Sequence, residues 1–148
     1  MEKRLILILS CNLLFCACLK LDSNLYNNSN PINSYLLDDY KGEQDFKLDN
    51  NYNIPANLIN TFTLLSQLPN ETTPKKIYAI YIGDISKISS DTVILYCHGN
   101  KWHMDFYWQR AKLLAHTNGK NRYGVLMMDY RGYGLSEGKP SEDGLYAD

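Results

Sequence analysis

A serine flanked by glycines is the first candidate for chemistry in this sequence. The stretch GLSEG, from Gly134 to Gly138, matches G-x-S-x-G, a pattern that can present a nucleophilic serine at a tight turn between a strand and a helix. Under this interpretation Ser136 is the nucleophile. The residues behind it argue against that role, because Lys139 and Pro140 prevent a helix from starting directly after the serine. The local sequence therefore favours a structural loop, with a catalytic Ser136 as the alternative.

Two glycine-containing segments follow apolar runs and could form a binding site together. HGNKWH (98–103) follows the apolar run Val93–Cys97, and DYRGYGLSEGKP (129–140) follows the run 124–128. In parallel α/β sheets the ligand site lies at the carboxyl ends of the strands. We therefore expect both segments at one edge of a sheet, where Gly99 would permit close approach of the backbone.

Several classes of function are excluded by composition and spacing. The 148-residue chain has a formal net charge of -1 and 45% hydrophobic residues, so no excess of positive charge points to nucleic acid. Gly132 and Gly134 begin a G-x-G-x-x-G pattern, but its third glycine is replaced by Glu137, and no G-K-[ST] occurs. The three histidines, at positions 98, 103 and 116, lack H-E-x-x-H spacing and a cysteine cluster. We expect no metal and no other cofactor.

The elements that must position these loops are visible from position 75 onward. Residues 75–84 and 93–97 read as strands, the second as a strand buried on both faces. A helix is predicted after Asp105, which is its expected N-cap, with Gly119 as its stop, and residues 123–130 form the next buried strand. This order implies a right-handed crossover and parallel pairing of the last two strands. Upstream, apolar spacing predicts a short helix between Pro55 and Pro69.

The combination of these motifs carries a resemblance to a known family. VILYCHGN, a helix, and then VLMMDYRGYGLSEGKPSEDGLYAD resemble the N-terminal half of α/β-hydrolase-fold proteins, in the Bem46-like and serine aminopeptidase-like branch. The resemblance covers the range 77–148. It implies an α/β fold: the N-terminal part of an α/β-hydrolase-type, mostly parallel sheet with covering helices, which is incomplete in this chain.

The resemblance also implies roles for individual residues. The backbone N–H of Asn100 would donate to the oxyanion formed in acyl transfer, supported by His98 and Gly99, which shape the turn; the alternative is that His98 only packs and Asn100 only turns. Asp129 and Arg131 would organise the following loop, together with Gly132, Gly134 and Ser136. The nucleophile, acid and base of the family are expected beyond Asp148. Ser141 is the predicted N-cap of the helix that begins within PSEDGLYAD.

The N-terminal sequence predicts export rather than folding. Residues 1–17 combine Lys3 and Arg4 with a short apolar stretch, as in a signal peptide, and three of the four cysteines (11, 16 and 18) lie there or just after it. The segment resembles a bacterial lipoprotein signal with Cys18 as the lipidated residue; an unlipidated secretory signal or an uncleaved anchor is the alternative. Residues 18–50 are expected to be a flexible, irregular tether, and residues 51–148 a partial α/β-hydrolase domain.

Three hypotheses about function follow. The chain is expected to be the N-terminal part of an extracytoplasmic serine hydrolase that acts on a small-molecule ester or amide, inactive alone and held at the membrane by a lipid anchor, with a secreted or periplasmic location as the alternative. The second hypothesis is a non-catalytic, lipid-anchored lipoprotein that binds a partner. In the third, Ser136 is active with unusual partners.

Overall fold

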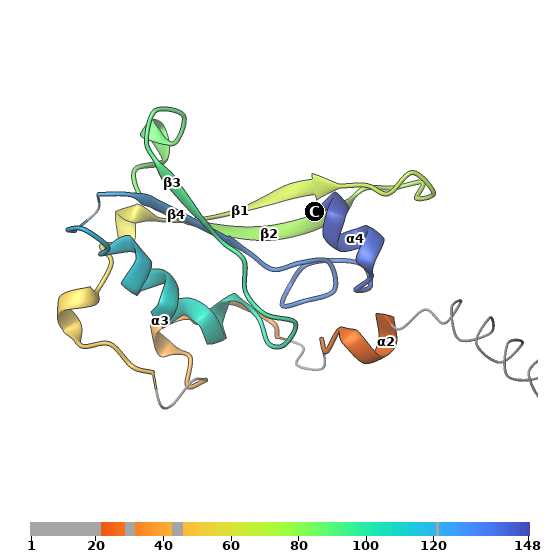
Figure 1. Ribbon diagram of the computed structural model, residues 1–148, viewed down its shortest axis with the longest axis horizontal. Helices are drawn as coiled ribbons and strands as arrows, with labels where there is room; N and C mark the ends of the chain where they lie inside the picture. The colour runs from red at the N-terminus through yellow and green to blue at the C-terminus, as the bar shows by residue number, and fades with distance from the viewer. Residues whose placement is uncertain (1–21, 29–31, 43–45, 121) are drawn as a thin grey trace, which may run out of the picture.

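The described residues form one mixed sheet with helices, an α/β fold as predicted, but two of its three strand pairings are antiparallel, whereas the sequence predicts a mostly parallel sheet (Figure 1). The computed structural model describes residues 22–28, 32–42, 46–120 and 122–148. The strands are β1 (Ile59–Ser66), β2 (Lys75–Ile82), β3 (Val93–Tyr96) and β4 (Gly124–Met128), in the order β1-β2-β4-β3. β3 and β4 are parallel, as predicted, whereas β2 pairs antiparallel with both β1 and β4.

Helices and short turns connect and flank this sheet. The α-helices are α2 (Asp22–Leu25), α3 (Met104–Ala115) and α4 (Glu142–Ala147), and the 3-10 turns are η1 (Leu37–Asp39), η2 (Asn50–Tyr52), η3 (Ala56–Leu58) and η4 (Ile85–Lys87). In Figure 1, α3 lies against one face of the sheet, and α4 lies beyond the ends of β3 and β4. The Ser141 hydroxyl caps α4 by accepting from the Gly144 N–H at 3.0 Å, which confirms the predicted N-cap.

The core lies between α3 and the sheet. One face of α3 is buried through Met104, Trp108 and Ala111, which pack against a cluster that includes Ile80 and Val125. Apolar residues three and four positions apart in α3 share one face, whereas those in the strands alternate. This packing anchors the βαβ unit, and with it the loops after β3 and β4.

The short helix predicted between Pro55 and Pro69 is wrong. Residues 59–66 form β1, which pairs with β2 along its whole length, from Ile59 opposite Ile82 to Ser66 opposite Lys75. The apolar spacing suited a helix face, but β-branched residues favour a strand, and the ladder to β2 satisfies the backbone. Tertiary pairing outweighed the local periodicity.

Two further predictions are corrected at β3 and α3. β3 is not buried on both faces: it is an edge strand in the described sheet, and Leu95 is 59% exposed. Asp105 is not the N-cap of α3. His103 occupies that position without a side-chain capping bond, and Asp105 lies in the first turn of the helix, which ends at Ala115, before Gly119.

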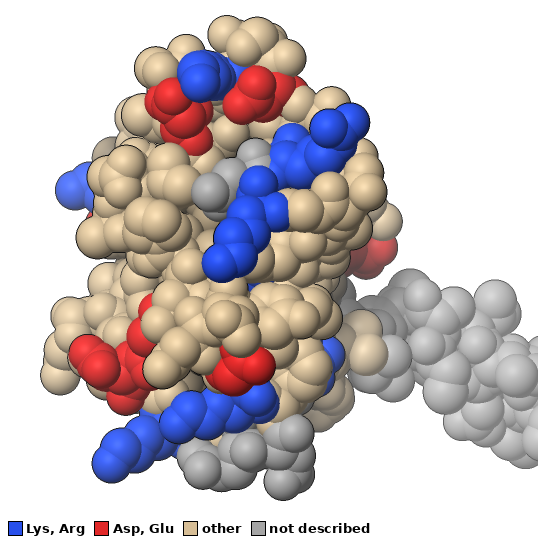
Figure 2. Space-filling view, turned by 90° about the vertical axis from the view of Figure 1, so that its left-hand side faces the viewer, with Lys and Arg blue, Asp and Glu red and all other residues tan. Residues whose placement is uncertain are grey.

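The structure describes the N-terminal segment from residue 22 onward, with gaps at 29–31 and 43–45. The predicted signal peptide and Cys18 lie outside the described residues. Within the predicted tether, the backbone N–H groups of Leu36 and Leu37 both donate at 2.8 Å to the Asp105 carboxylate. No helix in the described ranges has both the length and the apolar character needed to cross a membrane. The face in Figure 2 carries Lys and Arg side chains interspersed with Asp and Glu, so it is not uniformly basic.

Candidate functional site

The loops after β3 and β4 meet at Asp129, the residue that directly follows β4. The His98 Nε2 lies 3.0 Å from Asp129 Oδ1, and both side chains are fully buried. The same carboxylate accepts from the Met104 N–H at 2.7 Å and from the Tyr35 hydroxyl at 2.6 Å. Asp129 thus connects four parts of the chain: the β4 end, the HGN turn, the start of α3 and the N-terminal segment.

His98 also determines how the next peptide group is oriented. Its Nδ1 lies 2.8 Å from the Gly99 carbonyl oxygen, which can only accept a hydrogen bond. In a trans peptide the C=O and the following N–H point in opposite directions. Contact with His98 therefore turns the Asn100 N–H away from the imidazole ring. The hydrogen bonds recorded for Asn100 among the described residues use its carbonyl oxygen and side-chain amide.

Asn100 is held from two sides by those bonds. Its carbonyl oxygen accepts from the Tyr133 hydroxyl at 2.9 Å and from the Asn27 N–H at 3.1 Å. Its side-chain amide donates to the Leu25 carbonyl, and Asn27 forms a parallel bridge with Lys101. The turn is thus fixed by side chains from the next loop and by backbone from the N-terminal segment.

The structure places Ser136 inside the loop after β4. Its hydroxyl donates to the Asp129 carbonyl at 2.7 Å and accepts from the Tyr78 N–H at 2.9 Å, and the residue is only 6% exposed. Gly134 has φ +52, and a Cβ there would meet Asp129 Oδ2 at 1.9 Å. In this geometry the Ser136 hydroxyl joins the loop to β2 and β4.

Arg131 lies on the far side of the same loop. Its Nη1 pairs with Glu71 at 2.8 Å, and its Nη2 lies 3.1 Å from Asp148 Oδ1. The Arg131 N–H also donates to Asp148 at 2.7 Å, and Nη2 donates to the Ser66 hydroxyl at 2.8 Å. Burial lowers the pKa of Arg131, but the bonds to Glu71 and Asp148 outweigh it and raise the pKa. The guanidinium remains charged and ties the loop to β1 and α4.

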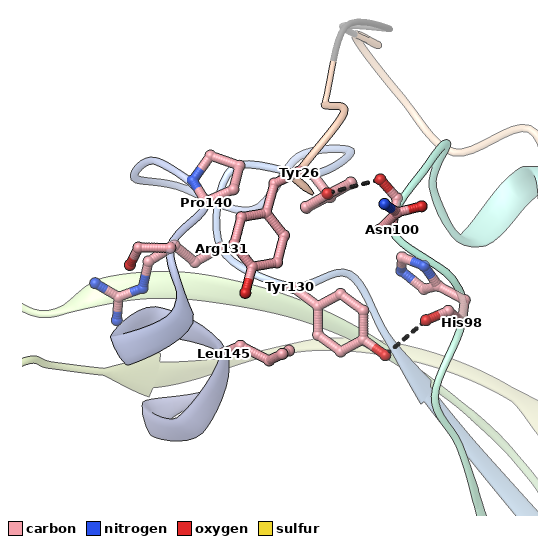
Figure 3. Close-up of a pocket in the computed structure, with 9 residues that line it drawn as sticks. Tyr26, His98, Asn100, Tyr130, Arg131, Pro140 and Leu145 are labelled. Atoms are coloured by element: carbon pink, nitrogen blue, oxygen red, sulfur yellow. Dashed lines mark hydrogen bonds between the residues drawn. The ribbon is translucent and has the colours of Figure 1, made fainter. Parts of the chain in front are cut away.

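A pocket opens between the two loops and α4 (Figure 3). Tyr130 and Tyr133 border it, and their hydroxyls donate to the carbonyls of His98 and Asn100, both at 2.9 Å. Burial raises the pKa of both tyrosines, so both hydroxyls stay protonated as donors. No group of three or more His, Cys, Asp or Glu in the described part of the chain could hold a metal ion.

Several residues of this network were not found from the sequence. Tyr35 precedes Asp129 by 94 residues, and no local pattern connects the two. Burial, followed by the charge of Asp129, raises the Tyr35 pKa above its ordinary value. Tyr130 and Tyr133 lie within the quoted DYRGYG motif, and the glycines on either side of Tyr133 were the available signal.

Comparisons with known proteins give partial matches. No protein-family model matches the chain. The uncharacterized protein YfhR of Escherichia coli K12 is 40% identical over 55 residues, which are 37% of this chain and 18% of that protein. Lysophosphatidylserine lipase ABHD12 of Danio rerio is 45% identical over 62 residues, 40% of this chain and 15% of that protein. Each of these two matches is confined to 40% of this chain or less.

Other matches are similar in extent. The uncharacterized protein Rv2307c of Mycobacterium tuberculosis H37Rv is 42% identical over 59 residues, 40% of this chain and 20% of that protein. The matched segment spans only 15–20% of the length of these curated relatives. A crystal structure of a candidate hydrolase from Agrobacterium vitis S4 aligns with 54% of this chain and 28% of its own, at 20% identity and a TM-score of 0.38.

Proposed function

We propose that this chain forms the N-terminal part of a serine hydrolase that cleaves esters or amides through an acyl-enzyme, in the Bem46-like and serine aminopeptidase-like branch. Asn100 would supply one of the two N–H donors to the oxyanion. The observation that carries the proposal is the contact of His98 with the Gly99 carbonyl, which orients the Asn100 N–H. The similarity to a lipase over 62 residues supports it.

The nucleophile, acid and base belong, in this proposal, to residues beyond Asp148. Ser136 is a poor nucleophile in the described geometry, because its hydroxyl is buried and bound to the backbone of Asp129 and Tyr78. A nucleophile needs an adjacent base to accept its proton. We therefore expect the chain alone to be inactive, with hydrolysis only when the missing groups are supplied.

The location follows the same proposal. Residues 1–17 would direct export, and Cys18 would carry the lipid. Residues 18–50 would link this anchor to the domain that begins near residue 51. The hydrolase would then act outside the cytoplasm on a small-molecule substrate. A secreted or periplasmic form without lipid is the alternative. Metabolic labelling with a radioactive fatty acid, lost in Cys18→Ser, tests the anchor.

The experiment that tests the hydrolase begins with the coding sequence after codon 148. A downstream G-x-S-x-G in any frame is expected, and its absence would overturn the proposal. The chain joined to that continuation should react with a fluorophosphonate probe, whereas labelling of the isolated chain that is lost in Ser136→Ala would instead make Ser136 the nucleophile.

Two substitutions at one position then test the oxyanion donor. In the joined protein, Asn100→Pro removes the backbone N–H and should lower kcat by about 10²–10³-fold, the usual cost of losing one such donor. Asn100→Ala is the matched control, because it keeps the N–H and loses only the side-chain bond to Leu25. A folded Asn100→Pro protein with unchanged kcat would remove Asn100 from the proposed site.

A non-catalytic, partner-binding lipoprotein is the second candidate. The observation that favours it is the edge strand β3, where the Leu95 side chain and Cys97 are exposed. Free strand edges and exposed apolar side chains are suited to contacts with other proteins. A purified chain that is monomeric, unfolds cooperatively and binds no hydrophobic dye would favour this candidate over an interrupted enzyme.

A further inference from the structure

The pocket between the two loops has the chemistry of a site for a hydrocarbon group. Six of the residues around it are Tyr26, Asn100, Tyr130, Tyr133, Pro140 and Leu145 (Figure 3). They come from the N-terminal segment, the HGN turn, the loop after β4 and α4. We propose that this pocket binds the short, uncharged hydrocarbon part of an ester or amide substrate; the proposal rests on the proposed function and narrows its substrate class.

The tyrosine hydroxyls at the pocket donate hydrogen bonds to backbone carbonyl oxygens. Tyr130 donates to the His98 carbonyl and Tyr133 to the Asn100 carbonyl, so both rings can present carbon atoms to the pocket. A Tyr ring whose hydroxyl is satisfied offers an apolar surface with little freedom to move. The walls therefore favour a ligand part that needs no hydrogen bonds.

The two basic side chains that line the pocket, Arg131 and His98, also bind other groups of the protein. The Arg131 guanidinium points away from the pocket in Figure 3 and binds Glu71, Ser66 and Asp148. Both ring nitrogens of His98 face other acceptors, at Gly99 and Asp129. Among the described residues that line the pocket, the two basic side chains, Arg131 and His98, are thus already bound to other groups, so the lining disfavours a carboxylate or phosphate.

The size of the pocket limits the length of the group. Its volume is about 120 Å³. A dry apolar cavity of about 150 Å³ in another protein binds benzene. The pocket can therefore hold a chain of about four carbons, which is shorter than a fatty-acid tail.

The position of the pocket connects it to the proposed chemistry. Asn100 borders the pocket, and the same residue carries the N–H assigned to the oxyanion. A hydrocarbon chain in the pocket would place its attached carbonyl near this turn, and binding of the unreacting part of a substrate can orient the reacting carbonyl. Tyr26 forms one wall on a segment that is itself bound to Asn100 through Leu25 and Asn27.

The test measures binding to the isolated chain and needs no catalysis. Titration with methyl butyrate, followed by NMR of the Leu145 methyl groups, should give saturable shifts, whereas sodium butyrate should bind more weakly. Leu145→Trp fills the pocket and should weaken methyl butyrate binding by about tenfold or more. The matched control is Leu113→Trp, since Leu113 is an equally exposed helical leucine, 40% against 41%, outside the pocket lining; it should bind like the wild type.

A second variant covers the case in which Leu145→Trp fails to fold. Tyr26→Ala removes one wall and should raise the affinity for methyl hexanoate relative to methyl butyrate. The proposal is overturned if the wild type shows no saturable shifts, if a folded Leu145→Trp binds equally well, or if Tyr26→Ala leaves the ratio unchanged. Failure of the hydrolase proposal is distinguishable, because the joined protein would then not react with the fluorophosphonate probe while these binding results still held.

Discussion

At the scale of single residues, burial determines what the polar groups near β4 can do. Asp129 is fully buried, yet its carboxylate accepts from His98, Met104 and Tyr35. Removing a partner from such a group leaves an uncompensated charge, which costs more than the interaction itself contributes. The arrangement explains why a carboxylate at the end of a buried strand is tolerated.

His103, in contrast to Asp129, is a buried side chain whose hydrogen-bonding capacity is only partly used by its neighbours. It is 1% exposed, its Nδ1 has no hydrogen-bond partner among the described residues, and it packs against the Tyr40 ring. Burial lowers its pKa below the ordinary 6.5, with a smaller lowering by His98, while Asp129 and Asp105 partly oppose the shift. Burial thus favours the neutral form of His103 in the folded chain.

This pKa predicts a pH dependence of stability. As pH falls below about 6.5, the unfolded chain takes up a proton at His103 that the folded chain resists, so the free energy of unfolding should fall, by at most about 1.4 kcal/mol per pH unit. His103→Phe should flatten this slope, measured by urea unfolding between about pH 7 and 5.5. His116→Phe, at the partly exposed end of α3, is the control and should retain the slope. Equal slopes for wild type and His103→Phe would contradict the prediction.

At the scale of elements, the start of α3 binds the N-terminal segment. Asp105 accepts from the N–H groups of Leu36 and Leu37, and Lys112, one of the buried residues of the same helix, pairs with Asp38. Burial raises the pKa of Asp105, and the two N–H bonds lower it in part. The helix thus contributes its first turn and its buried polar side chains to order residues that lie far away in sequence.

Hydrogen exchange can test that role of α3. Asp105→Ala should speed exchange of the Leu36 and Leu37 amides by about tenfold or more, because each loses a hydrogen bond to a charged acceptor. The measurement is amide exchange resolved by NMR. Asp39→Ala, an exposed neighbour in η1, should leave both rates unchanged. If Asp105→Ala does not alter them, the carboxylate does not order this segment in solution.

At the scale of the whole molecule, Arg131 connects parts that the sheet alone does not hold together. Its side chain is 2% exposed, and the guanidinium binds Glu71 in the β1–β2 connection, Ser66 at the end of β1, and Asp148 after α4. The Asp148 side chain is fully buried in return. The buried pair of Arg131 and Asp148 is stable only while both of these charges are present.

The predicted cost of removing Arg131 follows from the buried Asp148 carboxylate that would remain without its partner. Arg131→Met should lower the free energy of unfolding by about 3–5 kcal/mol, because Asp148 stays buried without its partner. Adding Asp148→Asn should recover part of that loss, so the double variant is less destabilised than the sum of the two single ones. Urea unfolding measures all three, with Arg122→Met, an exposed arginine, as the near-neutral control. Strict additivity would show that the two residues do not interact energetically.

Much of the fold was predictable where local signals and pairing agree. The apolar runs of β2, β3 and β4, the helix between the last two, and the Ser141 cap could all be predicted, because burial favours residue types that periodicity reveals. The region 59–66 could not, since Phe62 and Leu65 suit a helix face and only pairing with β2 makes the segment a strand. The prediction of Asp105 as an N-cap was wrong for a similar reason. Its carboxylate oxygens accept from the N–H groups of Leu36 and Leu37, almost 70 residues away.

The sequence by itself determined the order of the elements from β2 onward and the location of the HGN turn and the loop after β4, because these depend on residue type and near neighbours. Only the tertiary structure decided that Asp129 holds His98 and Tyr35, that His98 orients the Asn100 peptide, and that tyrosines close an apolar pocket beside it. Hydrogen bonds and cavities join residues that are distant in the chain, and local sequence carries no record of which distant groups will meet.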